Sequence, residues 1–282
     1  MIKMSLMIYV LLVITTVIIG FISAMIGIGG GILLVPTLLF LGFDAHQAVG
    51  ISVTAVMFTG VSSFIEYFRQ KRIDWKLGLL LELVTAPGAI LGAYTTTFIT
   101  AAFLEILFAL LLLINSVIVL KGHHYSETGH SSGTWHYIKA GHHRFFGIRR
   151  VLIDRDGKNI EYVVNLALVL PACFLAGFAA GFFGISGGVL KVPVLIAGGL
   201  PVNLATGTSS LMVTITAFAA FITHASLEHI NYIYLVFIAP SLVIGAQIGA
   251  RFSQRVSSKN LRYFIAGLYI LLAGLIVLRY FI

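Results

Sequence analysis

Apolar runs of about 20 residues recur along the chain and are separated by short polar segments. A helix needs about 20 apolar residues to cross the ~30 Å hydrocarbon core of a bilayer, so these runs predict membrane-spanning helices. The long runs occupy residues 4–26, 45–68, 77–99, 102–120, 162–185, 203–224, 232–252 and 261–282.

Two further apolar runs, at residues 32–43 and 189–200, are short. Each would make roughly 18 Å of helix at about 1.5 Å per residue, which cannot cross the core alone. Each run therefore either crosses with help from the glycine-rich stretch before it or enters the membrane as a half-helix. The predicted fold class is all-α, a polytopic membrane helix bundle with about 8–10 membrane segments.

One stretch of sequence occurs twice without a gap. Residues 20–36 read GFISAMIGIGGGILLVP, and residues 177–193, which lie 157 positions further on, read GFAAGFFGISGGVLKVP. In each copy clustered glycines interrupt an apolar segment. We name residues 27–31 the first break and residues 184–188 the second break. The shift of 157 persists well beyond this motif, which indicates a duplicated unit.

The duplication divides the chain into three parts. An N-terminal transmembrane repeat is expected at residues 1–120 and a C-terminal transmembrane repeat at residues 162–282. A histidine-rich loop at residues 121–161 joins them. Towards the end of this loop, an alternation of apolar and polar residues around Asp156-Gly157 predicts a small β-hairpin with its turn at that dipeptide.

The composition excludes an ordinary soluble domain. The chain is 59% hydrophobic and 10% charged, whereas about a quarter of the residues of a soluble domain are charged. The net charge of +8 does not indicate nucleic-acid binding, because the basic residues lie in loops, where they act as topology signals.

The positions of the basic residues favour an inverted second repeat. Of the 18 Lys and Arg residues, four lie at residues 69–76, seven at residues 121–161 and four at residues 251–262. These loops share one side of the membrane only if each repeat crosses it five times, and the positive-inside rule makes that side cytoplasmic. Inverted repeats with broken helices are typical of secondary transporters, which bind substrate near the midplane between the repeats. The three remaining basic residues are Lys3, Lys191 and Arg279.

The two breaks predict an anion pocket. Backbone amides at the start of a helix need partners inside a membrane, and the helix dipole there favours an anion. If the helices after the two breaks face each other, their amino ends would bind one small anion. The alternative is close helix packing through small residues. The candidate residues are Gly29, Gly30 and Gly31 in the first break and Ser186, Gly187 and Gly188 in the second.

Two charged residues lie inside predicted membrane segments. Lys191 belongs to the second short run, and Leu34 stands at the matching position of the first. Lys191 could neutralise an anionic substrate, or its ammonium group could snorkel to the headgroups. Glu82 could carry a coupling proton, or it could pair with a helix end or with Lys191.

Small and hydroxyl residues follow each short run, as HQAVGIS at residues 46–52 and NLATGTSS at residues 203–210. Hydroxyl groups at helix starts can bind oxyanions. The alternative is helix capping by Asn203 or Thr206, with the other hydroxyls bonded to backbone carbonyls. The candidate substrate ligands are Ser52, Thr208, Ser209 and Ser210.

We expect neither a metal site nor a cofactor. Six of the nine histidines lie in the loop, but their spacing matches no zinc motif, and Cys173 is the only cysteine. Exposed histidines on a cytoplasmic loop are the better interpretation. No Ser-His-Asp, HExxH or P-loop pattern is present, so an enzyme is not expected. The loop histidines are His123, His124, His130, His136, His142 and His143.

These motifs together resemble the TauE/SafE sulfite-exporter family of membrane permeases. The resemblance covers essentially the whole chain, and it implies about eight membrane segments and the movement of sulfite, sulfonates or related small sulfur anions. The chain departs from the usual family pattern at Ser186 and Lys191, and both departures bear on the choice of substrate. The resemblance rests on GIGGGILLVP at residues 27–36, HQAVGIS at residues 46–52, RIDW at residues 72–75, GISGGVLKVP at residues 184–193 and NLATGTSS at residues 203–210.

The sequence therefore predicts a multi-pass transporter of small anions, working by alternating access in a prokaryotic cell membrane. The alternatives are an anion channel and a membrane-embedded binding or sensor subunit whose loop docks a cytosolic partner. The expected partners are the anionic substrate and the lipid bilayer, with no nucleic acid. Small-residue faces at residues 88–92 and 245–249 could form a homodimer.

Overall fold

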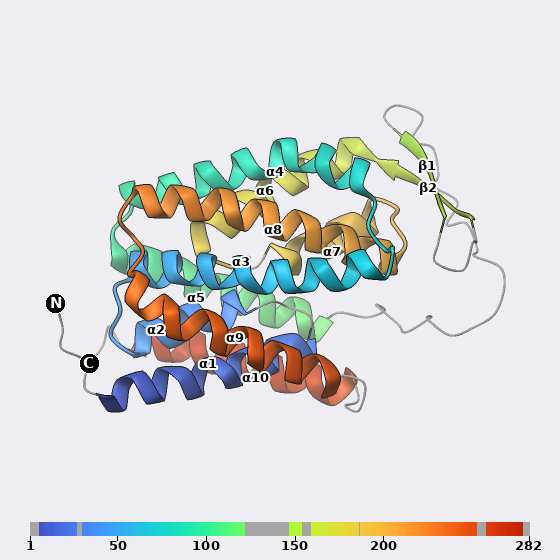
Figure 1. Cartoon of the computed structure of the whole chain (residues 1–282). Coiled ribbons are helices and arrows are strands. Elements are labelled where there is room, and N and C mark those ends of the chain that lie inside the picture. The colour runs from blue at the N-terminus through green and yellow to red at the C-terminus, as the bar shows by residue number, and fades with distance from the viewer. Residues whose placement is uncertain are drawn as a thin grey trace.

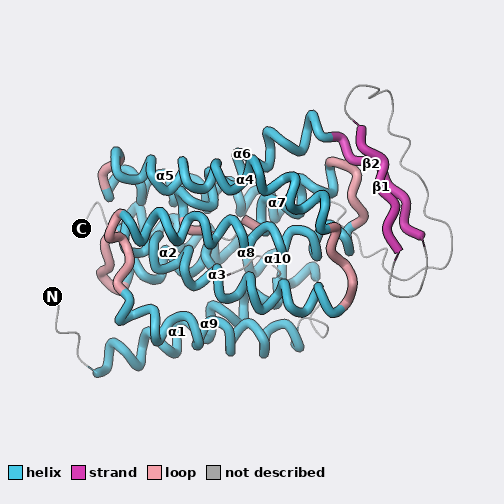
Figure 2. Tube along the Cα trace, turned by 45° about the horizontal axis from the view of Figure 1, so that its top comes forward, coloured by secondary structure: helices cyan, strands magenta, loops and turns pink. Residues whose placement is uncertain are grey.

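The computed structural model describes residues 6–26, 30–121, 147–153, 159–185, 187–252 and 258–278. In this part of the chain the helices lie side by side in a bundle, and a β-hairpin lies at one end (Figure 1, Figure 2). In chain order the elements are α1 (Leu6–Ile26), α2 (Gly31–Phe40), α3 (Ala45–Arg69), α4 (Trp75–Thr95), the 3-10 turn η1 (Thr96–Phe98), α5 (Ala101–Lys121), β1 (Gly147–Ile153), β2 (Asn159–Asn165), α6 (Leu166–Phe183), α7 (Gly188–Ala197), α8 (Val202–Ser226), α9 (Tyr232–Phe252) and α10 (Ser258–Leu278).

Five of the described helices are long and apolar enough to cross a membrane by length and composition: α3, α4 with η1, α6, α8 and most of α9. The bundle presents large apolar side chains outward; Leu83 is 72% exposed and Val236 is 69% exposed. Soluble monomers rarely expose large apolar patches, so these surfaces suit contact with lipid. The all-α membrane class predicted from the sequence is confirmed. The ten-residue helices α2 and α7 each measure only about 15 Å.

Glycines bring helices of the two repeats into backbone contact. A Cβ atom on Gly92 of α4 would lie 2.1 Å from the carbonyl oxygen of Phe178 in α6, and one on Gly249 of α9 would lie 2.1 Å from that of Phe21 in α1. The two contacts are equivalent, because Gly249 and Phe178 lie 157 positions after Gly92 and Phe21. These glycines belong to the small-residue faces at residues 88–92 and 245–249, which could form a homodimer according to the sequence; in the structure, helices of the same chain contact these glycines.

The equivalent helices α3 and α8 lie side by side and run antiparallel (Figure 1). Near the start of α3, a Cβ atom on Gly50 would lie 2.7 Å from the carbonyl oxygen of His229, which follows α8. Near the start of α8, a Cβ atom on Gly207 would lie 1.9 Å from the carbonyl oxygen of Arg72, which follows α3. These two contacts are equivalent as well, because Gly207 and His229 lie 157 positions after Gly50 and Arg72. The contacts are therefore reciprocal, which indicates that the repeats pack around a pseudo-two-fold axis.

The hairpin lies between the two repeats in the sequence. Its strands pair antiparallel, with Gly147 opposite Asn165 and Ile153 opposite Asn159. The turn expected at residues 156–157 lies outside the described residues. Figure 1 shows the hairpin at the end of the bundle opposite the start of α1.

The helix expected at residues 162–185 begins later than predicted. Residues 162–165 belong to β2, and α6 starts at Leu166. Asn165 is the N-cap residue, and its side chain accepts a hydrogen bond of 3.3 Å from the amide of Leu168. The preceding residues 163–164 are both valine, and β-branched residues favour a strand.

Candidate functional site

The two breaks meet beside α3. A Cβ atom on Gly31, the first residue of α2, would lie 2.5 Å from the carbonyl oxygen of Gly184. The buried hydroxyl of Ser52 donates a hydrogen bond of 2.7 Å to the carbonyl oxygen of Gly184 and lies 3.3 Å from that of Gly31. One serine of the first repeat thus contacts both breaks.

Gly184 ends α6 with φ +67°, in the left-handed region that favours glycine. A Cβ atom at this position would also lie 2.8 Å from the carbonyl oxygen of Val49. Both the backbone conformation and the close approach of α3 therefore require glycine at the start of the second break.

A buried ion pair follows the second break. Lys191 of α7 is fully buried, and its Nζ atom donates to Oε1 of Glu82 in α4 at 3.0 Å. The Nζ atom also donates to Oγ1 of Thr216 in α8, and this hydroxyl lies 2.9 Å from both carboxylate oxygens of Glu82. The three side chains, which we name the buried triad, join the two repeats. Lys191 does not snorkel to the membrane surface; it pairs with Glu82, one of the partners considered from the sequence.

The ammonium group of Lys191 lies close to the second break. A Cβ atom on Gly187 would lie 3.1 Å from Cε and 3.5 Å from Nζ of Lys191. The side chain therefore turns back towards the start of α7, the usual direction of helical side chains. A cation and the positive end of a helix dipole thus lie together, a combination that attracts anions. Glu82 supplies the negative charge in this conformation.

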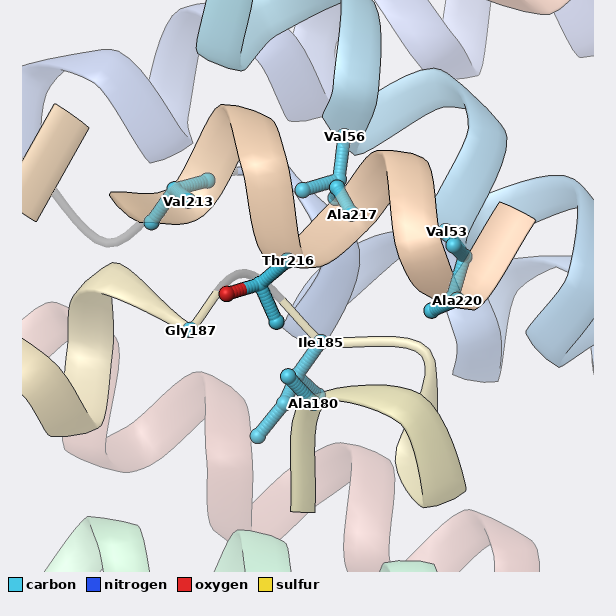
Figure 3. A pocket seen from close by; sticks show the side chains of 9 residues that line it. All are labelled: Val53, Val56, Ala180, Ile185, Gly187, Val213, Thr216, Ala217 and Ala220. Carbon is cyan, nitrogen blue, oxygen red and sulfur yellow. The ribbon is translucent and has the colours of Figure 1, made fainter. Parts of the chain in front are cut away.

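A small cavity borders the buried triad between α3, α6, the second break and α8. Thr216 and Gly187 form part of its wall, with Val56 of α3 and Val213 of α8 (Figure 3). Val56 and Val213 are equivalent under the shift of 157, so the cavity touches the pseudo-two-fold axis. Its volume is about 10 Å³, enough for about one water molecule. The described conformation is closed to a larger anion.

The buried triad occurs on only one side of the pseudo-two-fold axis. The positions equivalent to Glu82, Lys191 and Thr216 hold Ala239, Leu34 and Thr59. Ala239 and Leu34 are buried and apolar. The fold therefore provides two similar positions, and only the one beside the second break carries charge.

The other candidate residues lie in different surroundings. Gly30 is the N-cap residue of α2 and packs against the side chain of Leu242, and Gly188 is the first residue of α7. Ser210 donates within α8 to the carbonyl oxygen of Gly207. The hydroxyl of Ser209 is buried and, within the described ranges, has no hydrogen-bond partner. None of these residues lines the cavity. Gly29 and Ser186 lie outside the described residues.

Thr208 belongs to a network that fastens the hairpin to the bundle. Its hydroxyl accepts a hydrogen bond of 3.0 Å from the amide of Asp74, which precedes α4. The carboxylate of Asp74 accepts from both Nε and Nη2 of Arg150 in β1, and from the hydroxyl of Tyr162 in β2 at 2.5 Å. Burial alone would raise the pKa of Asp74, but the hydrogen bonds from Arg150, Tyr162 and the amide of Leu77 outweigh it and lower the pKa.

Histidines gather at the opposite end of the bundle. His224 is buried, with Nε2 2.9 Å from the carbonyl oxygen of Gly181 and Nδ1 3.1 Å from Nδ1 of His229. The rings of His46 and His229 lie tilted by 47° to each other, with their centroids 5.1 Å apart. Burial, followed by the charge of His46, lowers the pKa of His229. Among the described residues no group of three or more His, Cys, Asp or Glu could hold a metal ion. The six loop histidines lie outside these residues.

Thr216 and the network of Asp74 were not identified from the sequence. A signal for Thr216 exists, because it lies seven residues after Ser209 and thus on the same helical face. The partners Arg150 and Asp74 are 76 residues apart, and no local pattern joins them.

Comparison with known proteins identifies relatives along nearly the whole chain. The family model described as sulfite exporter TauE/SafE matches residues 12–276. The probable membrane transporter protein YunE of Bacillus subtilis is 28% identical over 263 residues, which cover 90% of this chain and 91% of YunE. A probable membrane transporter protein of Methanocaldococcus jannaschii is 24% identical, with 92% of this chain and 91% of the relative covered.

A plant relative matches a shorter part. Sulfite exporter TauE/SafE family protein 6 of Arabidopsis thaliana is 25% identical over 103 residues, which cover 36% of this chain and 24% of the relative. No solved structure matches the chain significantly. The long apolar helices, the doubled glycine breaks and the match over residues 12–276 lead to one conclusion: this multi-pass membrane protein belongs to the TauE/SafE sulfite exporter family of membrane transport proteins.

Proposed function

We propose that this protein is a secondary transporter of small sulfur-containing anions, such as hydrogensulfite or sulfonates, in a prokaryotic cell membrane. The observation that carries the proposal is Lys191, a fully buried cation at the start of α7, beside a cavity between the repeats. Charged residues inside membrane segments are costly and usually functional. The position of this charge between the two repeats supports the proposal, because transporters with inverted repeats bind substrate between their repeats.

The chemistry of the second break supports an anion as the substrate. The first amides of α7 have no partner within their own helix, and the dipole of α7 favours negative charge at that end. The ammonium of Lys191 and the hydroxyl of Thr216 add two hydrogen-bond donors. A sulfur oxyanion offers several acceptor oxygens to such a set. The family description and the name of the plant relative also point to sulfite.

The small volume of the cavity favours a carrier over a channel. The volume of about 10 Å³ holds about one water molecule, so an anion can bind only after helices move apart. The repeats pack against each other around a pseudo-two-fold axis, and rocking of one repeat against the other would open the cavity to each side in turn.

Counterflow in proteoliposomes tests the proposal. Vesicles loaded with an unlabelled anion are diluted into the same anion in labelled form, with hydrogensulfite, methanesulfonate and sulfate tested separately. We expect transient, saturable accumulation of at least one of the first two anions, and none in protein-free vesicles. Non-saturating flux without counterflow would instead identify a channel. Absence of any flux, together with binding of a cytosolic protein that is lost when residues 123–146 are deleted, would identify a sensor subunit.

A further inference from the structure

Among the residues that the structure describes, the charges around the cavity sum to zero. Lys191 and Glu82 form one ion pair. The thiol of Cys173 on α6 is a third titratable group that interacts electrostatically with this pair. The remaining polar partner is the neutral hydroxyl of Thr216 on α8. Isolated charge is costly in a medium of low dielectric constant. Entry of one monovalent anion would leave the site with a charge of −1.

A proton on Glu82 would remove this excess charge. Glu82 would change from carboxylate to carboxylic acid, Lys191 would pair with the anion, and the site would again be neutral. We propose that each monovalent anion crosses the membrane together with one proton, which Glu82 carries. This inference rests on the proposed function, and it makes transport electroneutral.

Thr216 provides the means for Lys191 to change partners. Its Oγ1 atom lies 2.9 Å from both oxygens of Glu82 and accepts from Lys191 Nζ. With Glu82 protonated, the new O–H group donates to the same Oγ1 atom. Lys191 is then released towards Gly187 at the start of α7, where a Cβ atom would lie 3.5 Å from Nζ. The proton comes from water on the loading side, and it leaves to water on the other side with the anion.

The same charge balance selects the substrate by valence. A monovalent sulfonate or hydrogensulfite is matched by one proton on Glu82. A dianion such as sulfate would need a second proton. Among the described residues, no second carboxylate contacts Lys191 or Glu82 to accept it. Methanesulfonate is therefore the best probe, because it stays monovalent and cannot cross the bilayer as a neutral acid.

The experiment follows protons and anions together in proteoliposomes that hold a pH indicator. We expect addition of methanesulfonate to acidify the interior by one proton per labelled anion taken up. A potassium diffusion potential set with valinomycin should change the uptake less than twofold. In Glu82→Gln, acidification should disappear while counterflow of methanesulfonate persists, because glutamine resembles the protonated acid. Glu161→Gln, an exposed change in the hairpin, should behave like the parent.

Two results would overturn the inference. One is net uptake of methanesulfonate by the parent protein without acidification, and the other is unchanged acidification in Glu82→Gln. If Glu82→Gln fails to fold, the proton count and the response to membrane potential of the parent protein still decide the matter. Absence of counterflow with every anion tested would refute the proposed function itself, and this inference with it.

Discussion

The hydroxyl of Ser52 donates a hydrogen bond of 2.7 Å to the carbonyl oxygen of Gly184, 132 residues further along the chain. This bond connects a helix of the first repeat to the break of the second. Its equivalent, Ser209, is also buried, but its hydroxyl has no hydrogen-bond partner among the residues that the structure describes. In the part of the chain that the structure describes, the two halves thus differ in this hydrogen bond as well as in their charges.

Replacement of Ser52 by alanine should loosen the second break. The buried carbonyl of Gly184 would lose its donor, which we expect to lower the free energy of unfolding by about 1–3 kcal/mol. Thermal unfolding of the protein in detergent measures the effect. The control is Ser226→Ala, an exposed change at the end of α8 that should stay within about 0.5 kcal/mol of the parent. Equal stability of both variants would show that the bond contributes little.

Gly92→Ala and Gly249→Ala should destabilise the protein to a similar degree. In each case the new Cβ atom would lie 2.1 Å from a carbonyl oxygen of the other repeat, and such overpacking costs about 1–3 kcal/mol or more. Gly267→Ala of α10 is the control, because no atom lies within 4 Å of its Cβ position. It should gain up to about 1 kcal/mol from helix propensity. The measurement is the melting temperature of each variant. Equal melting temperatures for all three variants would refute the reciprocal packing.

Removing one partner of the ion pair in the buried triad should lower the free energy of unfolding much more than removing both partners. Lys191→Leu leaves Glu82 buried without its partner, which should cost about 3–5 kcal/mol. The double variant Glu82→Ala/Lys191→Leu copies the apolar pair Ala239 and Leu34 of the other half, so it should return to within about 1 kcal/mol of the parent. A double-mutant cycle on thermal unfolding measures the coupling. Additive effects of the two single changes would contradict the pairing.

Docking of the hairpin should depend on pH through Asp74. Its pKa is lowered below the ordinary value of 3.8, so the native state binds fewer protons than the unfolded chain in that range. The stabilisation is therefore complete at neutral pH and is lost as pH falls below about 3.8 through the lowered pKa. Asp74→Asn should cost at least about 1.5–3 kcal/mol near neutral pH. The difference in the free energy of unfolding between this variant and the parent, measured by thermal unfolding, should become smaller in acid. A difference that does not change with pH would exclude Asp74 as the titrating group.

The sequence was sufficient to predict the membrane class and most helix positions. Apolar runs encode membrane segments locally, so α3 and α9 lie within about one residue of their predicted bounds. The repeat also located both breaks, and the cost of charge in a membrane singled out Lys191 and Glu82. The start of α6 was missed because the valines at residues 163–164 are as compatible with a membrane helix as with a strand.

The contacts within the site could not be predicted in the same way. Glu82 and Lys191 are 109 residues apart, and only packing decides whether the carboxylate meets the lysine or a helix end. Thr216 is one of several hydroxyl residues in α8, and its role follows from what lies opposite it. Tertiary contacts of this kind leave no local periodicity in the sequence.

In the proposed mechanism, a small anion binds beside Lys191 at the second break. Equilibrium binding of labelled methanesulfonate to the purified protein, compared with Glu82→Ala/Lys191→Leu at one fixed pH, tests it most directly. Loss of a charge-assisted hydrogen bond of about 1.5–3 kcal/mol should weaken binding at least about tenfold. Equal affinities of the parent and of a folded double variant would contradict the claim.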